Sequence, residues 1–254
     1  MKAAKALVRN AFARAAEGYD KAAEFQRAAA GQLMEGLPFD LSPARILDSG
    51  CGTGHGLPLL NRRWPMAQVV SLDFAFAMVQ QLARGAGQLC GDAECLPLVT
   101  QSMDFYWSNL ALQWCDADSF MREAARVMKP GAKLAVSTLG PDTFNELRTA
   151  FKGVDTYRHT IDFCAEARLR SAFSGAGLRV QQLQRVPAVL HYPDISMLLD
   201  AVRKLGANRV TGVNRRGGLM GKVEWTRFVA QYERLRTTSG LPLSYDTILV
   251  YAEK

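Results

Sequence analysis

The sequence predicts an α/β fold in which helices cover both faces of a mostly parallel sheet. Between residues 45 and 138, short apolar stretches that suit buried strands alternate with helical patterns. Between the first of these strands and the helix after it stand Gly50, Gly52, Gly54 and Gly56. Glycines in that position let the backbone turn tightly and approach a ligand closely. We therefore expect a ligand at the carboxyl edge of the sheet.

The length of 254 residues suits a single domain over residues 1–254 that carries additions. We expect a helical lid over residues 1–37 and a helical cap insertion over residues 193–242, before the last strand. The net charge of +7 suggests an acidic partner.

Cysteine and histidine usage limits the class of protein. The five cysteines are odd in number and form no C-x-x-C pair, which favours a reducing compartment over a disulfide scaffold. The three histidines are isolated from one another and from paired cysteines, so we expect no metal site. No apolar stretch is long enough to cross a membrane, and the N-terminus lacks the apolar core of a signal peptide. These features predict a cytoplasmic protein.

The N-terminal 37 residues read as helix, interrupted at Gly18. Tyr19 either reaches over the ligand or belongs to a packing helix. Apolar residues recur at helical spacing: Leu7, Phe12, Ala16, Tyr19 and Ala23.

The central region carries the strand–helix alternation, and Pro130-Gly131 predicts a turn that starts its last strand. Strands are expected at 45–48, 68–73, 87–91, 103–108 and 132–138, and helices at 55–63, 75–84 and 117–128.

The C-terminal part predicts two more strands, which makes the sheet seven-stranded. They cover 180–192, weakened by Pro187, and 243–251, with helices at 164–177, 195–205 and 224–236.

Polar side chains stand at the ends of four expected strands: Asp48, Asp73, Asp92 and Asn109. One alone would suit a helix cap, but ligands of open α/β sheets bind beyond these strand ends. Asp73 suits ribose hydroxyls, and Asp92 suits the amino group of adenine. Asp48 would repel a pyrophosphate and attract a cation, which favours S-adenosylmethionine (SAM) over NAD.

Two further side chains, Phe74 and Met78, either sandwich the adenine or pack in the core. The segment from Asn109 to Trp114 would lie beside the reacting group of the cofactor.

These residues together resemble the class I SAM-dependent methyltransferases over about residues 40–140. The shared pattern is Leu-Asp-x-Gly-Cys-Gly-Thr-Gly, then Asp73, Gly-Asp-Ala-Glu and Lys-Pro-Gly. The resemblance implies a Rossmann-like fold, SAM as cofactor and S-adenosylhomocysteine (SAH) as product. The cofactor-binding residues it implies are Asp48, Gly50, Cys51, Gly52, Gly54, Asp73, Phe74, Met78, Asp92, Ala93, Glu94, Asn109 and Leu110.

A narrower resemblance, to the malonyl-acyl-carrier-protein O-methyltransferases of early biotin synthesis, spans nearly the whole chain. It implies methyl transfer from SAM to the free carboxylate of malonyl-acyl-carrier protein or malonyl-CoA, giving the methyl ester that starts pimeloyl assembly. It depends on the segments at 11–20, 107–115, 143–148, 205–208 and 241–245.

A carboxylate is ionised at neutral pH, so the reaction requires no acid or base, only positioning. Arg148 is the expected cation for the substrate carboxylate, with a solvated helix face as the alternative. Tyr19 would assist it, and Gln113 and Trp114 complete the expected substrate site.

Two other functions stay open: methylation of a free small carboxylic acid, and SAM or partner binding without catalysis. Nucleic-acid methylation is not expected, because Ser108-Asn109-Leu110-Ala111 stands where an Asn/Asp-Pro-Pro-Tyr motif would be. We expect a monomer that docks an acidic acyl carrier protein on basic residues of the cap, although a solvated basic surface is the plainer reading. These residues are Arg203, Lys204, Arg209, Arg215 and Arg216.

Overall fold

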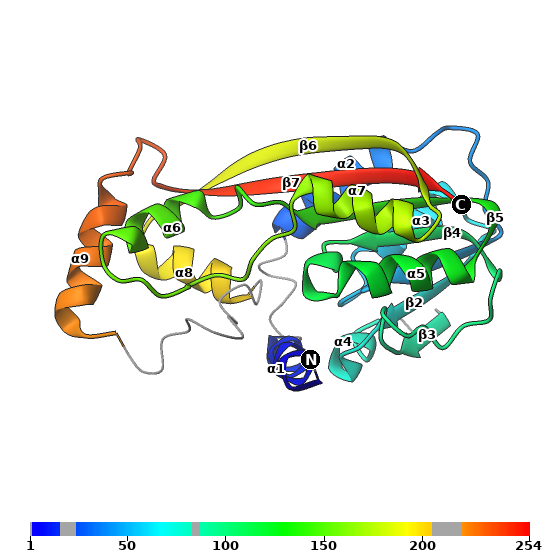
Figure 1. Ribbon diagram of the computed structural model, residues 1–254, viewed down its shortest axis with the longest axis horizontal. Coiled ribbons are helices and arrows are strands. Elements are labelled where there is room, and N and C mark those ends of the chain that lie inside the picture. Colours follow the sequence, from blue (N-terminus) through cyan, green and yellow to red (C-terminus); the bar gives the residue numbers. More distant parts are fainter. Residues whose placement is uncertain (1, 16–23, 83–86, 205–219) are drawn as a thin grey trace.

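The computed structural model describes residues 2–15, 24–82, 87–204 and 220–254. It contains one seven-stranded sheet in the order β3-β2-β1-β4-β5-β7-β6 (Figure 1). The first five strands of the chain pair in parallel, and β7 runs antiparallel to both β5 and β6. The predicted mostly parallel sheet is confirmed. Its strands are β1 Arg45–Ser49, β2 Gln68–Asp73, β3 Gly87–Cys90, β4 Met103–Asn109, β5 Met128–Leu139, β6 Arg179–Tyr192 and β7 Leu241–Glu253.

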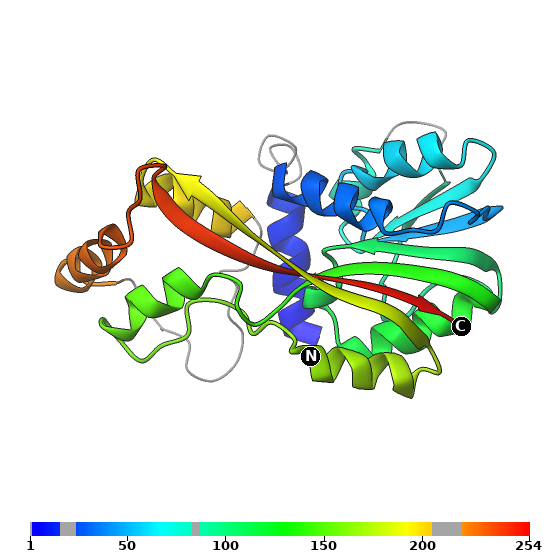
Figure 2. The same cartoon turned by 90° about the horizontal axis from the view of Figure 1, so that it is seen from above.

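Helices cover both faces of this sheet (Figures 1 and 2). On one face lie α2 and α3, and on the other lie α5 and α7. The described helices are α1 Lys2–Ala15, α2 Glu24–Glu35, α3 Gly56–Arg63, α4 Phe76–Val79, α5 Ala117–Val127, α6 Asn145–Lys152, α7 Glu166–Gly175, α8 Ile195–Lys204 and α9 Lys222–Glu233, with a 3₁₀ turn η2 at Leu112–Trp114.

Strand β4 shows why this sheet has two apolar faces. Phe105 and Trp107 pack in the cluster under α2 and α3, whereas Tyr106 packs in the cluster under α5. Successive side chains of a strand point to opposite faces, so a strand covered on both sides reads as a continuous apolar run.

The strand order reverses beside β1, which has β2 on one side and β4 on the other. Their carboxyl ends, at Ser49, Asp73 and Asn109, therefore meet at one edge of the sheet. In open α/β sheets a crevice forms at such a reversal.

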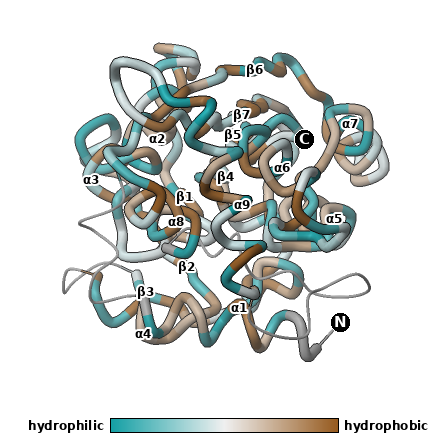
Figure 3. The backbone as a smooth tube through the Cα atoms, turned by 90° about the vertical axis from the view of Figure 1, so that its left-hand side faces the viewer, coloured by the Kyte–Doolittle hydropathy of each residue, from teal (hydrophilic) through white to brown (hydrophobic). Residues whose placement is uncertain are grey.

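At the other end, β6 and β7 extend beyond β5 as a two-stranded ribbon. Residues 241–246 pair only with residues 187–192. Helices α6, α8 and α9 gather around this ribbon; Figure 3 views the molecule from that end. They share an apolar cluster that includes Phe144, Leu198, Phe228 and Tyr232. We call this region the cap end.

Four details differ from the sequence-based expectations. Strand β5 begins at Met128 and passes through Pro130-Gly131, where we expected a turn. Pro187 does not weaken β6, because this strand forms the edge of the sheet and one side of it needs no ladder partner. Helix α4 ends at Val79, well short of the expected 75–84. Leu7, expected on the packing side of its helix, is 44% exposed.

Candidate functional site

The glycine loop after β1 depends on backbone conformations that favour glycine. Gly50, Gly52 and Gly54 have φ angles of 74°, 55° and 94°. The N–H groups of Gly50 and Cys51 both donate to the carbonyl oxygen of Leu72, at 2.7 and 3.0 Å. A Cβ at Gly50 would overlap the Cβ of Ala111. Only glycine therefore lets the loop lie against the turn that follows β4.

Asp73, at the carboxyl end of β2, holds this loop in place. Its Oδ2 accepts a hydrogen bond from the N–H of Gly52 at 3.0 Å, and its Oδ1 accepts one from Ala75 at 2.8 Å. The residue is only 8% exposed. Burial raises the pKa of Asp73, and the backbone hydrogen bonds oppose that effect. Each carboxylate oxygen keeps further acceptor capacity for a ligand.

Asp48 is a second buried carboxylate, 2% exposed. Its Oδ2 and the Nε1 of Trp107 are both buried without a hydrogen-bond partner in the described parts of the chain. Both atoms lie 3.1 Å from the position that a Cβ at Gly56 would take. Burial, followed by the charge of Asp73, raises the pKa of Asp48 to about 7. A ligand that brings a positive charge would favour the ionised form.

A cavity of about 640 Å³, part of it open to solvent, lies at this edge of the sheet. Three elements bring its walls together: the glycine loop, the ends of β2 to β4 and helix α1. The lining residues are Lys5, Val8, Phe12, Gly50, Gly52, Leu72, Asp73, Phe74, Gly91, Asp92, Ala93, Leu110, Ala111, Trp114 and Cys115.

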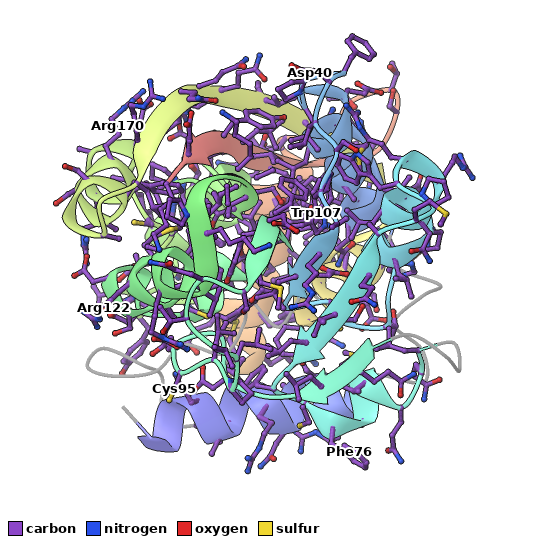
Figure 4. All side chains as sticks on the ribbon, turned by 90° about the vertical axis from the view of Figure 1, so that its right-hand side faces the viewer. Asp40, Phe76, Cys95, Trp107, Arg122 and Arg170 are labelled. Carbon is purple, nitrogen blue, oxygen red and sulfur yellow. The ribbon has the colours of Figure 1, made fainter. Side chains whose placement is uncertain are left out.

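The sequence predicted a helical lid over residues 1–37 but not which residues of α1 line the cavity, namely Lys5, Val8 and Phe12. In Figure 4 this helix runs along the cavity edge between the labelled Cys95 and Phe76. The Nζ of Lys5 lies 2.7 Å from an oxygen of Asp92 and 2.8 Å from an oxygen of Glu94. The spacing of Lys5, Val8 and Phe12, at i, i+3 and i+7, marks one helix face and was the available signal.

Several predicted residues lie beside the cavity without lining it. Asn109 donates to the carbonyl oxygen of Gln26 at 3.0 Å and accepts from Ser137 at 2.7 Å. Gln113 donates to the carbonyl oxygen of Leu110 at 2.7 Å. Met78 is buried with Ala75 in a small apolar cluster, which is the core-packing alternative.

The glycine loop also borders a second hollow, on its other side. Gly54 lines that hollow, together with Arg27 and His55. Cys51 is buried beside Val79 and Leu82. Neither Gly54 nor Cys51 lines the first cavity.

Arg148, the expected cation for the substrate, is half-buried on α6 and is absent from the cavity lining. Its guanidinium donates to the carbonyl oxygens of Thr143 and Pro141, the latter at 2.6 Å. It therefore fastens the loop between β5 and α6. Tyr19 lies outside the described residues.

The expected partner surface is described only in part. Arg203 is exposed on α8 and pairs with Asp200. Lys204 ends α8, and the structure does not describe its side chain. Arg209, Arg215 and Arg216 lie outside the described residues.

Two other kinds of feature are absent from the described residues. No helix among them is long and apolar enough to cross a membrane. Nor do these residues hold a cluster of histidine, cysteine, aspartate or glutamate that suits a metal ion.

Comparison with known proteins gives three informative matches. A profile described as "Methyltransferase domain" matches residues 47–136. A malonyl-[acyl-carrier protein] O-methyltransferase of Dechloromonas aromatica is 45% identical over 250 residues, which cover 98% of this chain and 95% of that protein. The biotin biosynthesis bifunctional protein BioHC of Cellvibrio japonicus is 38% identical over 247 residues, covering 95% of this chain and 49% of that protein.

Among solved structures, geranyl diphosphate C-methyltransferase from Streptomyces coelicolor, in a complex that includes S-adenosyl-L-homocysteine, aligns with a TM-score of 0.54. The alignment covers 89% of this chain and 75% of that one, at 15% identity. At this identity the likeness concerns the fold alone.

Proposed function

Because the chain belongs to the malonyl-[acyl-carrier protein] O-methyltransferases, we propose that it methylates the free carboxylate of a malonyl thioester carried on acyl carrier protein. The product would be the malonyl methyl ester that starts pimeloyl assembly in biotin synthesis. The observation that carries this proposal is the near full-length match to such an enzyme.

The residues of the cavity fit SAM, the methyl donor of this class. Gly50 and Gly52 line the cavity, so the backbone of the glycine loop forms part of its wall. The carboxylates of Asp73 and Asp92 face the same space as the rings of Phe74 and Trp114. Acidic groups and aromatic faces suit a cationic nucleoside. When bound, SAM supplies a methyl group on a positively charged sulfur.

Roles for individual residues follow from these positions. Asp73 would accept hydrogen bonds from the ribose hydroxyls while it keeps those from Gly52 and Ala75. Asp92 and Ala93 would meet the adenine, with Phe74 against its ring. Asp48, with its unpartnered Oδ2, would contribute negative potential to the positively charged end of the ligand.

The substrate carboxylate needs a partner and no base, because it is already ionised at neutral pH. Arg148 supplies five N–H donors, and two carbonyl oxygens take up only part of them. We propose that a remaining N–H meets one carboxylate oxygen, which leaves the other oxygen free to react. Tyr19, Gln113 and Trp114 would shape the space around it.

For the partner we propose the basic cap end as the docking surface. Acyl carrier proteins are acidic, and Arg203 on α8 is exposed. Exposed charges of opposite sign steer two proteins toward each other and orient the encounter. The five free cysteines support a reducing compartment, so we place the reaction in the cytoplasm.

The test is incubation with labelled SAM and malonyl-, succinyl- or acetyl-carrier thioesters. We expect label on the malonyl thioester and none on the acetyl thioester, which lacks a free carboxylate. If free malonic acid were labelled as fast as the malonyl thioester, the free-acid alternative would be favoured. Binding of SAM with no transfer to any of these acceptors would favour a non-catalytic protein.

A further inference from the structure

Helix α1 covers the cavity, yet it is only lightly attached to the rest of the protein. Between positions 5 and 14 each side chain of α1 is half-buried or exposed. The next helix, α2, buries Phe25, Ala29, Ala30 and Leu33. Segments with few buried apolar contacts open at a low free-energy cost. We therefore expect α1 to separate from the cavity at a lower free-energy cost than α2.

The attachment of α1 at the cavity is polar at one point and aromatic at another. Lys5 makes its two ion pairs, with Asp92 and Glu94, near one end of the helix. About two helical turns further on, the ring of Phe12 packs edge-on against Trp114 and Phe74, with centroids 5.5 and 6.4 Å apart. The polar attachment is the one that a single substitution can remove cleanly.

The two carboxylates that receive Lys5 are held independently of α1. The Oε1 of Glu94 accepts a hydrogen bond from the N–H of Asp116 at 2.9 Å. The Oδ1 of Asp92 accepts one from the N–H of Glu94 at 3.0 Å. The two carboxylates therefore hold their positions without Lys5, whose ammonium group arrives with α1. The side chain of Glu94 is 7% exposed, that of Lys5 28% and that of Asp92 40%, so solvent screens the pair with Glu94 less than the pair with Asp92.

We propose that Lys5 is a latch that fastens α1 as a lid over the nucleoside end of the cavity, and that SAM and SAH exchange requires its ion pairs with Asp92 and Glu94 to break. This inference rests on the proposed function in one respect, the binding of SAM in this cavity. It assigns Lys5 a role in the rate of cofactor exchange. Lys5 is a positioning residue, because it acts through α1.

The latch predicts a kinetic signature that a fixed wall of the cavity would not produce. Loosening a lid speeds capture and release alike, so the dissociation constant changes little. Loss of a direct ligand contact instead weakens binding through faster release alone. Both rates should also rise with salt in the wild type, because salt weakens partly exposed ion pairs.

The experiment is stopped-flow measurement of SAH binding and release by the full chain. Lys5→Met keeps an unbranched, mostly apolar side chain of nearly the same length and removes its charge. Arg9→Met, on the exposed side of the same helix, is the matched control. We expect both rates to rise about fivefold in Lys5→Met and to stay unchanged in Arg9→Met. Raising salt from about 0.05 to about 0.5 M should speed exchange in the wild type and hardly affect Lys5→Met.

A second variant, Glu94→Gln, checks that the partner matters. Glu94→Gln should speed exchange less than Lys5→Met, and it should have no further effect in the Lys5→Met background, because that variant already lacks the Lys5–Glu94 ion pair. Unchanged rates in Lys5→Met, or faster release with unchanged capture, overturn the latch. Failure of SAM and SAH to bind the wild type at all overturns the proposed function instead.

Discussion

The edge of the sheet with the glycine loop and the cavity, which we call the cofactor end, differs from the cap end in how charged side chains are held. At the cofactor end, the carboxylates of Asp48 and Asp73 are buried, and backbone N–H groups rather than cations hold Asp73. At the cap end, solvent-exposed arginines form ion pairs with aspartate side chains. Arg185, whose side chain is 45% exposed, clasps the buried Asp246 with bonds of 2.9 and 2.6 Å.

This difference indicates at which positions the loss of one charge has a large effect on binding or stability. A charge in a buried site interacts through a low effective dielectric, so its loss or gain costs several kcal/mol. An exposed pair is worth about 0–1 kcal/mol and weakens with salt. Substitutions at the cofactor end should therefore have the larger effects.

The largest effect is expected for Asp73→Ala. The substitution removes the proposed acceptor for the ribose hydroxyls and also the two hydrogen bonds from the N–H groups of Gly52 and Ala75. Hydrogen bonds to a charged group are worth about 1.5–3 kcal/mol each, so SAM affinity should fall by at least about 100-fold. Asp73→Asn, which keeps one acceptor oxygen, should lose less. Calorimetric titration that finds wild-type affinity in Asp73→Ala would show that the cofactor lies elsewhere.

The second effect is the pH dependence of stability that Asp48 contributes in the ligand-free protein. Its pKa is about 7 in the folded state, above the ordinary value of about 3.9 in the unfolded chain. The folded state then binds more protons between these values, so its stability falls as pH rises from about 4 to about 7. The fall is at most roughly 4 kcal/mol.

Urea unfolding at several pH values would measure this contribution. Asp48→Asn should flatten the curve over that window, and Asp40→Asn, at an exposed position, should leave it unchanged. Parallel curves for the wild type and Asp48→Asn would refute the assignment of a buried, protonated Asp48.

The third effect moves to the cap end. Arg148→Ala should raise KM for the malonyl thioester and lower kcat, at a cost of about 2–3 kcal/mol, while SAM affinity stays the same. Arg170→Ala, at an exposed arginine on α7, is the control. If KM and kcat of Arg148→Ala equal those of the wild type, Arg148 does not bind the substrate and only holds the loop between β5 and α6.

The smallest effect per residue belongs to the basic surface. Reversal of Arg203, Lys204 and Arg209 to glutamate should slow turnover of the malonyl-carrier protein, and added salt should do the same. Each charge should contribute about 0–1 kcal/mol. Malonyl-CoA, which lacks a folded acidic partner, should be much less affected. Equal slowing of both substrates would place the docking surface elsewhere, for instance on α1 with Arg9 and Arg14.

Features that depend on local sequence signals were predicted better than features that depend on distant pairing. Strand β2 has the bounds expected for it, and β1, β3 and β4 end within one residue of expectation. These strands combine apolar runs with a polar residue at the end, and both signals are local. The early start of β5 was missed, and there Met128 pairs with Met103 of β4. β6 lies within one residue of its expected bounds, but the weakening expected at Pro187 was wrong, because β7, from far along the chain, pairs with β6 on both sides of this proline.

By itself, the sequence determined the α/β class, the glycine loop and the acidic strand ends, since parallel strands necessarily bring Asp73 and Asn109 to one edge. Only the tertiary structure decided which charges meet. Lys5 reaches Asp92 across 87 positions of the chain, and Arg185 reaches Asp246 across 61. Periodicity specifies the face of an element on which a side chain lies, whereas the partner of that side chain depends on how whole elements dock.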